Sequence, residues 1–559
     1  MLRWVIGVAL GIAGLLGAAV YWAPSLILHY PELITIISEI RDPIGPNRPV
    51  VWEAGPDTPT VAPAERSPNV VVILVDDLGW NDLSWNGGGV ADGTVPTPHI
   101  NSLAHDGVEF TMGYAGNATC APSRAAILTG RYPQRFGFES TPAPPALGNF
   151  VASMRNENLA PGEPAVEFRA DLIDQVPAMD DQGVPSSEIT LAELLRENGY
   201  RTAMLGKWHL GGTEGMRPME QGFDEFLGFL SGAQLFGQPD DPEIISSRQL
   251  FDPIDLFLWK FLPFAVTKDG GPRFEPDAYM TDYLSSEAVK VIEANRHRPF
   301  FLYLAYNAPH TPLQATKADY DALSHIEDHA TRVYAGMIRA LDRGIGRVLE
   351  ALEKNGLEEN TLVIFSSDNG GANYIGLPDV NRPYRGWKMT FFEGGLHSPF
   401  FMKWPAVVPA GKKLDTPIAH IDVFSTVAAA TGAELPADRK IDGVDLLPYA
   451  TGQNPGDAHD ALFWRSGDYS VILAGGWKLQ VSERENKRWL FDLTEDPTEQ
   501  RNRIATEPGK AAELERRLDA HNQELGPRPW PVLVEGPIAI DRTLSERRVP
   551  GEEYVYWPN

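Results

Sequence analysis

Val70-Val71-Val72-Ile73-Leu74-Val75 decides the fold of this chain, because it is an uninterrupted run of apolar and mostly β-branched residues. A run of this kind, without alternating polar residues, is typical of a strand that is buried on both faces of a parallel sheet. It ends abruptly in Asp76-Asp77-Leu78-Gly79. The predicted strand therefore places two carboxylates at one edge of its sheet.

Later segments repeat this design, with helices between them. We predict strands at 200–205, 300–305 and 361–365, and helices at about 190–199 and 330–355. The first helix begins with a Thr-Leu-Ala-Glu capping box, and the second has apolar residues at helical spacing. Strands that alternate with helices predict a doubly wound α/β sheet.

The pattern changes beyond residue 430, where we expect a second, smaller domain. Residues 469–481 indicate a β-hairpin, and 489–493 is suited to pair with it. A helix is expected at about 508–525. The second domain is therefore predicted to be a small antiparallel sheet with one helix.

Two long insertions interrupt the α/β pattern, at 139–186 and 232–280. Both are rich in proline and acidic residues and show weak periodicity. We predict that they form loops over the strand ends. Loops in that place would select the substrate.

The N-terminus holds an uncharged run from Trp4 to Ser25, long enough to span a bilayer. A cleaved signal segment is the alternative, with Gly17-Ala18-Ala19 as the candidate cleavage site. We predict an exported protein, anchored on the periplasmic or extracellular side of a membrane, or secreted if the segment is cleaved. The expected domains are a membrane anchor or signal segment at 1–28, a Pro-rich tether at 29–68, a catalytic α/β domain at 69–430, and a small domain with a tail at 431–559.

Composition excludes several classes of protein. The 559 residues are 43% hydrophobic and 22% charged, as in a folded globular protein. A formal net charge of −27 argues against binding to nucleic acid or to an anionic membrane surface. Cys120 is the sole cysteine, so the chain has no intrachain disulfide. An anionic substrate would need a local cluster of positive charge.

Polar residues follow the ends of four predicted strands. Ligands of open α/β sheets bind beyond the carboxyl ends of the strands, so we expect these side chains to form one site. The strand-end residues are Asp76, Asp77, Lys207, His209, His310, Asp368 and Asn369.

The types of these side chains indicate their chemistry. Asp76, Asp77, Asp368 and Asn369 offer only oxygen, which suits Ca²⁺ or Mg²⁺ better than zinc. Lysines and histidines supply the positive cluster, and the histidines are candidates for proton transfer. The lysines are Lys207 and Lys388, and the histidines are His209 and His310.

Cys120 precedes a predicted helix, in which Pro122 suits the first turn and Gly130 the end. The N-terminus of a helix favours a thiolate or a bound anion. The alternative is a small buried hydrophobic residue. A metal, an anion clamp, a nucleophile and acid/base groups together indicate transfer of a sulfuryl or phosphoryl group.

These motifs resemble those of the type I, formylglycine-dependent sulfatases. Cys120-x-Pro122-Ser123-Arg124 with Leu128-Thr129-Gly130-Arg131 is similar to the signature of that family. The similarity covers roughly residues 69–505, and the blocks around His310 and Tyr334 resemble the arylsulfatase B-like branch. The resemblance implies an alkaline-phosphatase-like mixed sheet with a smaller C-terminal antiparallel domain. Further similar blocks are Asp76-Asp77, Gly206–Gly211, Ser367–Gly370, Arg385–Lys388, Glu393–Gly395 and Leu490–Pro497.

The resemblance also implies a nucleophile and a cofactor. A maturation enzyme would oxidise Cys120 to formylglycine, whose hydrate attacks sulfur with help from Asp368. The resemblance assigns one Ca²⁺ to the site, with Mg²⁺ as the alternative. The implied metal ligands are Asp76, Asp77, Cys120, Asp368 and Asn369.

The remaining implied roles concern charge and protons. Lys207 and Lys388 would hold the sulfate oxygens, and Arg124 would orient the modified side chain. His310 would protonate the departing alcohol, and His209 would take the proton whose loss expels sulfate. His105, His397 and His420 are expected to be structural.

Three questions remain open at the level of sequence. A phosphatase or phosphonate monoester hydrolase on the same scaffold is the first alternative to a sulfatase. A membrane-anchored, non-catalytic sulfate-binding protein is the second. The substrate is expected to be a sulfated small molecule or carbohydrate, with aryl sulfates as assay substrates.

Overall fold

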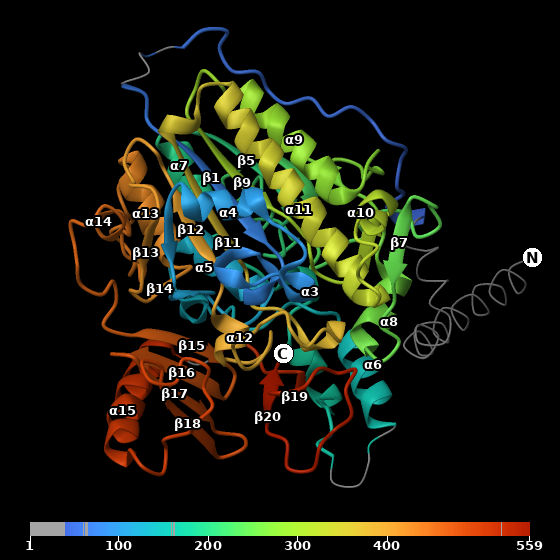
Figure 1. Ribbon diagram of the computed structural model, residues 1–559, viewed down its shortest axis with the longest axis vertical. Helices are drawn as coiled ribbons and strands as arrows, with labels where there is room; N and C mark the ends of the chain where they lie inside the picture. Colours follow the sequence, from blue (N-terminus) through green and yellow to red (C-terminus); the bar gives the residue numbers. More distant parts are fainter. Residues whose placement is uncertain (1–39, 60, 62–64, 158, 160–162, 527) are drawn as a thin grey trace, which may run out of the picture.

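The computed structural model describes residues 40–59, 61, 65–157, 159, 163–526 and 528–559 (Figure 1). A mixed nine-stranded sheet has the order β13-β2-β12-β11-β1-β9-β5-β6-β8, and helices cover both of its faces. The predicted doubly wound α/β architecture is confirmed. The strands of this sheet are β1 (Asn69–Val75), β2 (Val108–Phe110), β5 (Arg201–Lys207), β6 (Glu225–Phe229), β8 (Thr267–Lys268), β9 (Phe300–Ala305), β11 (Thr361–Ser367), β12 (Phe400–Lys403) and β13 (Lys412–Leu414).

Strand β1 lies in the interior of the sheet, parallel to β9 on one side and to β11 on the other. All of its residues are buried. Val71 and Ile73 belong to one hydrophobic cluster, whereas Val70 and Val72 belong to another on the opposite face. Both faces of β1 are covered by apolar side chains, which explains why residues 70–75 include no polar residue.

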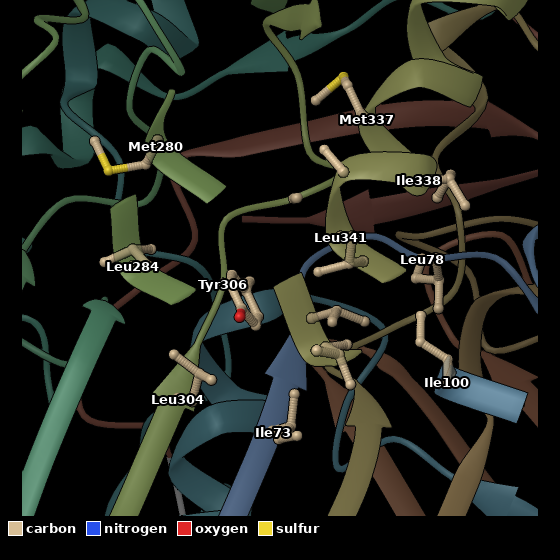
Figure 2. Packing of buried hydrophobic residues seen from close by; sticks show 14 of the residues in the cluster. Ile73, Leu78, Ile100, Met280, Leu284, Leu304, Tyr306, Met337, Ile338 and Leu341 are labelled. Atoms are coloured by element: carbon tan, nitrogen blue, oxygen red, sulfur yellow. The ribbon is translucent and has the colours of Figure 1, made fainter. Parts of the chain in front are cut away.

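Two long helices cover the first face. They are α9 (Met280–Ala294) and α11 (His329–Lys354), which pack against each other. Figure 2 shows Ile73 of β1 in the same cluster as Leu284 of α9 and Leu341 of α11. The predicted helix at 330–355 is therefore present with nearly the expected ends.

Three shorter helices cover the opposite face. They are α5 (Cys120–Thr129), α7 (Leu191–Glu197) and α13 (Asp422–Thr431), and each contacts the other two. The predicted capping box is formed, with the Thr190 side chain accepting from the Glu193 N–H and the Glu193 carboxylate accepting from the Thr190 N–H. The helix that starts with Cys120 is thus held between the sheet and two other helices.

A four-stranded antiparallel sheet with one helix forms the smaller part of the structure, as predicted. Helix α15 (Pro508–Leu525) packs on this sheet, with Leu514 in one cluster with Leu479. The domain boundary expected at 430 falls inside α13, and α14 (Leu447–Ala450) packs in the same cluster as α5. The strands are β15 (Leu462–Ser466), β16 (Tyr469–Ala474), β17 (Trp477–Ser482) and β18 (Lys487–Asp492).

The two insertions contain more regular structure than the predicted loops, and this expectation is wrong. Helix α6 (Pro145–Asn156) lies in the first insertion and α8 (Pro253–Phe261) in the second. Proline occupies the first turn of both, and Asp252 caps α8 by accepting from the N–H groups of Ile254 and Asp255. Helix α8 is short and mostly apolar, with Asp255 and Lys260 as its charged residues.

The C-terminal tail returns to the first insertion. Strand β19 (Val534–Ala539) pairs with β20 (Tyr554–Pro558) on one side and with β4 (Glu167–Phe168) on the other. This three-stranded sheet was not expected from the sequence. It joins parts of the chain that are more than 350 positions apart.

The described part of the predicted tether packs against the α/β domain. The Gly45 N–H donates to the Arg273 carbonyl at 2.9 Å, and the Trp52 indole N–H donates to Glu287 at 2.7 Å. The expectation of a Pro-rich tether at 29–68 is therefore wrong for these residues, which pack on the domain. The predicted anchor or signal segment at 1–28 lies outside the described residues. Within the described ranges, no helix has the length and apolar character needed to cross a membrane.

A buried ion cluster joins the small sheet to the α/β domain. The Lys478 ammonium of β17 lies 2.7 Å from Glu393 and 3.1 Å from Glu499, and all three side chains are buried. Burial raises the pKa of Glu499 to about 7. The two carboxylates are thus compatible with this interior only because the lysine lies between them.

Replacing Lys478 by methionine should destabilise the protein strongly. Removal of one partner leaves buried carboxylates without compensation, so we expect Lys478→Met to lower the free energy of unfolding by about 3–5 kcal/mol. Urea denaturation followed by tryptophan fluorescence measures this loss. Lys440→Met is the control, because it removes an exposed pair with Glu524 at 2.9 Å and should cost less than about 1 kcal/mol. Equal effects of the two substitutions would contradict this account.

Candidate active site

The predicted strand-end residues meet at the carboxyl edge of the sheet. β11, β1, β9 and β5 are consecutive neighbours and run parallel. Parallel neighbours end at the same edge, so the residues that follow these strands are brought together. Asp76 and Asp77 follow β1, Lys207 ends β5, His310 lies beyond β9, and Asp368 follows β11.

The backbone turns sharply at two of these residues. Asp77 and His209 both have a φ of 61°, in the left-handed region that few residues other than glycine adopt. The turn at Asp77 directs its N–H to the Asp368 carboxylate at 3.1 Å, and the Leu78 N–H to the Ser367 hydroxyl at 3.0 Å. Unusual backbone conformations of this kind concentrate at functional sites.

Two buried ion pairs form the floor of the site. The Lys207 ammonium lies 2.9 and 2.7 Å from the two oxygens of Asp76. Arg124 donates twice to Oδ2 of Asp368, at 3.0 and 2.8 Å, and once to the Lys207 carbonyl at 3.1 Å. Burial raises the pKa of Asp76 to about 7, against the opposing effect of Lys207.

Asp77 is the centre of a second group. The Lys388 ammonium lies 2.7 Å from Oδ1 of Asp77, and Asn369 donates to the same oxygen at 2.8 Å. The Tyr374 hydroxyl donates to Oδ2 at 2.9 Å, and Nε2 of His310 lies 3.6 Å from it. Burial alone would raise the pKa of Asp77, but Lys388 and His310 hold it below its usual range.

Cys120 is the first residue of α5 and is buried. The Lys388 ammonium lies 3.1 Å from its Sγ, and Asp77 Oδ1 lies 3.9 Å from it. Burial raises the pKa of the thiol to about 12 and outweighs the lysines, which favour the thiolate. The thiolate suggested by the helix N-terminus is therefore not favoured, and Cys120 is a neutral thiol in this environment.

The two histidines differ in their surroundings. His310 Nδ1 lies within hydrogen-bond distance of the Thr311 carbonyl, which only accepts, so this nitrogen carries the proton and a neutral ring presents the Nε2 lone pair to Asp77. Burial lowers the pKa of His310 to about 3. Nδ1 of His209 is buried without a hydrogen-bond partner, and burial together with Lys207 holds the pKa of this ring well below its usual value.

The donor set fits a cation. Ligand atoms of Asp76, Asp77, Cys120 and His310 all lie within 4.8 Å of one another. The buried Oδ1 of Asn369 has no hydrogen-bond partner, so it is available as a further oxygen ligand. The lone pair on Nε2 of His310 faces the Asp77 carboxylate, and this arrangement is compatible with a cation between the two groups. The set therefore suits a metal ion held mainly by oxygen.

The structure changes two of the expected details. Both oxygens of Asp368 accept hydrogen bonds, one from Arg124 and one from the Asp77 N–H, and Asp77 rather than Asp368 contacts the Cys120 sulfur. His310, expected only to transfer protons, joins the candidate metal ligands. Nine of the ten predicted site residues are linked to one another by hydrogen bonds, by ion pairs or as members of the candidate metal-ligand set. The tenth, His209, lines the same cavity as Cys120.

Sequence reasoning missed Tyr374. It lies in a short 3-10 helix, six positions beyond Asp368, and its role depends on its hydroxyl reaching Asp77. His420 was expected to be structural and does hold the Cys120 helix. Its two ring nitrogens lie 2.9 Å from the hydroxyls of Ser123 and Ser366.

Comparison with known proteins identifies the family. A family profile described as "Sulfatase" matches residues 68–433, more than half of the chain. The chain belongs to the sulfatase family. A second profile, "N-sulphoglucosamine sulphohydrolase, C-terminal", matches residues 385–525 of this sulfatase.

This sulfatase is similar to curated proteins and to solved structures. It is 33% identical to the N-acetylgalactosamine-6-sulfatase of Mus musculus, over 75% of this chain and 73% of the relative. It is 31% identical to the steryl-sulfatase of Rattus norvegicus, over 77% of this chain and 78% of the relative. The crystal structure of Ps i-CgsB in complex with k-i-k-neocarrahexaose superposes with a TM-score of 0.67 and 30% identity, covering 83% of this chain and 95% of that one. The protein is a sulfuric ester hydrolase.

The buried imidazole of His420 should make the stability of this sulfatase depend on pH. Burial lowers the pKa of His420 from 6.5 to about 3, so between these values the unfolded chain binds a proton that the folded one excludes. The free energy of unfolding should fall by about 1.4 kcal/mol per pH unit for this group as the pH drops below 6.5. His420→Gln should make that slope shallower by the same amount.

Urea denaturation at several pH values between about 4 and 7 measures the slope. His325→Gln is the control, because His325 is exposed and contacts only the Thr94 hydroxyl among the hydrogen bonds of its side chain. This substitution should leave the pH dependence as in the wild type. Identical slopes for wild type and His420→Gln would show that His420 is not held neutral.

Proposed function

We propose that this sulfatase hydrolyses sulfate monoesters with a nucleophile generated from Cys120. The observation that carries the proposal is the position of Cys120, whose Sγ lies 3.1 Å from the Lys388 ammonium and within the group of candidate metal ligands, while burial raises the pKa of its thiol to about 12. A thiol that does not ionise is a poor nucleophile. Oxidation of this side chain to formylglycine by a separate maturation enzyme, as the motif implies, gives an aldehyde whose hydrate offers a hydroxyl at the same place.

The charges of the site favour an anionic substrate once a cation is bound. Three buried carboxylates, Asp76, Asp77 and Asp368, are paired with three buried cations, Arg124, Lys207 and Lys388. The six formal charges balance, so a divalent cation would give the site an excess of two positive charges. Such a site attracts an anion, and a sulfate monoester carries one negative charge.

We propose Ca²⁺ as that cation, with Asp76, Asp77, Asp368, Asn369 and the modified Cys120 as the residues that would hold it. The oxygen-rich donor set supports Ca²⁺ over transition metals. When bound, the cation would supply positive charge to the sulfate oxygens and stabilise charge that develops in the transition state.

The chain's own residues then have distinct roles. Lys207 and Lys388 would bind sulfate oxygens, and Arg124 would keep Asp368 in place through its paired hydrogen bonds. His209 is proposed to accept the proton of the remaining hydroxyl on residue 120, and loss of this proton expels sulfate. Nδ1 of His209 is suited to this role because it has no partner within the described protein. His310 is proposed to take up a proton at Nε2 once the anionic substrate is bound and to pass it to the leaving oxygen, since Nδ1 faces the Thr311 carbonyl.

Loss of Cys120 should abolish hydrolysis. In a host that modifies the residue, Cys120→Ala should lower kcat/KM for an aryl sulfate by about 10³-fold or more. Mass spectrometry of the tryptic peptide that contains residue 120 should show an aldehyde in the active wild-type enzyme, and aryl phosphate should be a poor substrate. Full activity with an unmodified thiol would overturn the proposed nucleophile, and a strong preference for phosphate would overturn the proposed substrate.

Removal of the cation should lower both activity and stability. A chelator should abolish turnover, and Ca²⁺ should restore it better than Mg²⁺. At a Ca²⁺ concentration of about 100 times Kd, binding should add about 2.7 kcal/mol to the free energy of unfolding. Asp77→Asn should lose this stabilisation. Asp82→Asn should keep it, because Asp82 is equally buried but binds Tyr334 and the Gly79 N–H instead. If Ca²⁺ stabilised Asp77→Asn as much as it stabilises the wild type, the cation would bind elsewhere.

A further inference from the structure

A cavity of about 450 Å³ opens above the candidate nucleophile. Cys120, His209, His310 and Lys388 line its base. Its volume lies in the range of about 300–1,000 Å³ that is usual for pockets binding small organic ligands. Because the sulfate group would lie at the base, the rest of this cavity receives the alcohol or phenol part of the ester.

The walls of the cavity come from parts of the chain that lie far apart in sequence. They are α6, α8 and the sheet of β4, β19 and β20, and α6 contacts both α8 and β19 (Figure 1). Most of the side chains that these elements contribute are apolar. They include Leu147, Val151, Ile254, Phe257, Leu258, Phe261, Val534, Ile538 and Trp557.

The walls are closely packed. A Cβ atom at Gly148 of α6 would lie 2.4 Å from the Val534 side chain, so only glycine allows the helix to approach the tail sheet this closely. The Phe257 ring lies 4.4 Å from the Phe261 ring and 5.9 Å from that of Phe150 on α6. The apolar lining is therefore part of the fold and not a set of mobile surface side chains.

Most polar groups of the walls are already bound within the protein. Asp252 accepts from two N–H groups at the start of α8, and Asn559 exchanges two hydrogen bonds with the backbone of Thr141. Gln182 donates to the Pro177 carbonyl at 3.0 Å, and Arg155 donates to the Pro537 carbonyl at 3.4 Å. Asp252, Gln182 and Asn559 therefore have partners within the protein, whereas the Arg155 guanidinium, of which one N–H makes this bond, can also meet a polar group of a ligand.

Two wall residues have a buried polar atom without a hydrogen-bond partner. They are Thr141, through its hydroxyl, and Trp557, through its indole N–H. These two groups are suited to meet a few polar atoms of a ligand that is otherwise apolar. A sugar ring in the same place would bury several hydroxyls against carbon, and buried hydroxyls without partners are costly.

We infer that the alcohol part of the natural substrate is hydrophobic, a phenol, sterol-like or long-chain alcohol with at most a few polar groups, rather than a sugar. This inference rests on the proposed function, because it assigns the cavity to the ester that the base cleaves. The apolar walls of α6, α8 and the C-terminal tail select this class by burying its carbon surface.

A series of 4-alkylphenyl sulfates tests the inference with the formylglycine-bearing enzyme. Lengthening the alkyl group from methyl to hexyl changes apolar surface while the reactivity of the phenol stays nearly constant. Each added methylene should raise kcat/KM about fourfold until the cavity is filled, since burial of a methylene is worth about 0.8 kcal/mol. Monosaccharide sulfates should be cleaved at least about 10²-fold less efficiently than the hexyl compound.

Two substitutions in α8 test whether the dependence on alkyl length comes from the lining of the cavity. Leu258→Gln should flatten the dependence on alkyl length, because Leu258 lines the cavity. Leu256→Gln should leave it unchanged, because Leu256 is also half-buried on α8 but lies outside the lining residues. An absence of any chain-length dependence, or better cleavage of sugar sulfates, would overturn the inference. Failure to cleave every ester, the methyl compound included, would instead overturn the proposed function.

Discussion

The structure depends on mutual neutralisation of buried charges at one edge of a parallel sheet. Asp76, Asp77 and Asp368 are all buried beyond the ends of β1 and β11. An isolated buried carboxylate would cost several kcal/mol, so each needs a cation and hydrogen bonds. Lys207, Lys388 and Arg124 provide them. The strand, helix and loop that carry these cations are thus fixed by the same interactions that hold the three carboxylates.

This neutralisation also bears on the proposed chemistry. The three carboxylates and three cations leave the site with little net formal charge. In the proposed function, binding of a cation would add positive charge beside apolar walls, where electrostatic interactions are strong because water is excluded. The side chains proposed for activity are then the same ones that stabilise the fold.

The cavity depends on a second feature, the return of the chain from the small domain. Lys478 joins the four-stranded sheet to the α/β domain through Glu393 and Glu499. Beyond that sheet, the tail forms β19 and β20, pairs with β4 and lines the cavity together with α8. The smaller part of the protein thus contributes to the shape of the cavity beside Cys120 as well as to stability.

The sequence by itself determined the parts of this protein that depend on local chemistry. The apolar run before Asp76, the capping box at Thr190 and the hairpin near residue 475 each follow from propensities within a few residues, and the structure contains all three. Convergence of the strand-end residues followed from a general property of parallel sheets. Only the tertiary structure decided which atoms meet: that His310 faces Asp77, that Tyr374 donates to it, and that α6, α8 and the tail enclose an apolar cavity. These contacts join segments that are far apart in the chain, and no local pattern specifies them, because they form only when the sheet and its two domains have packed.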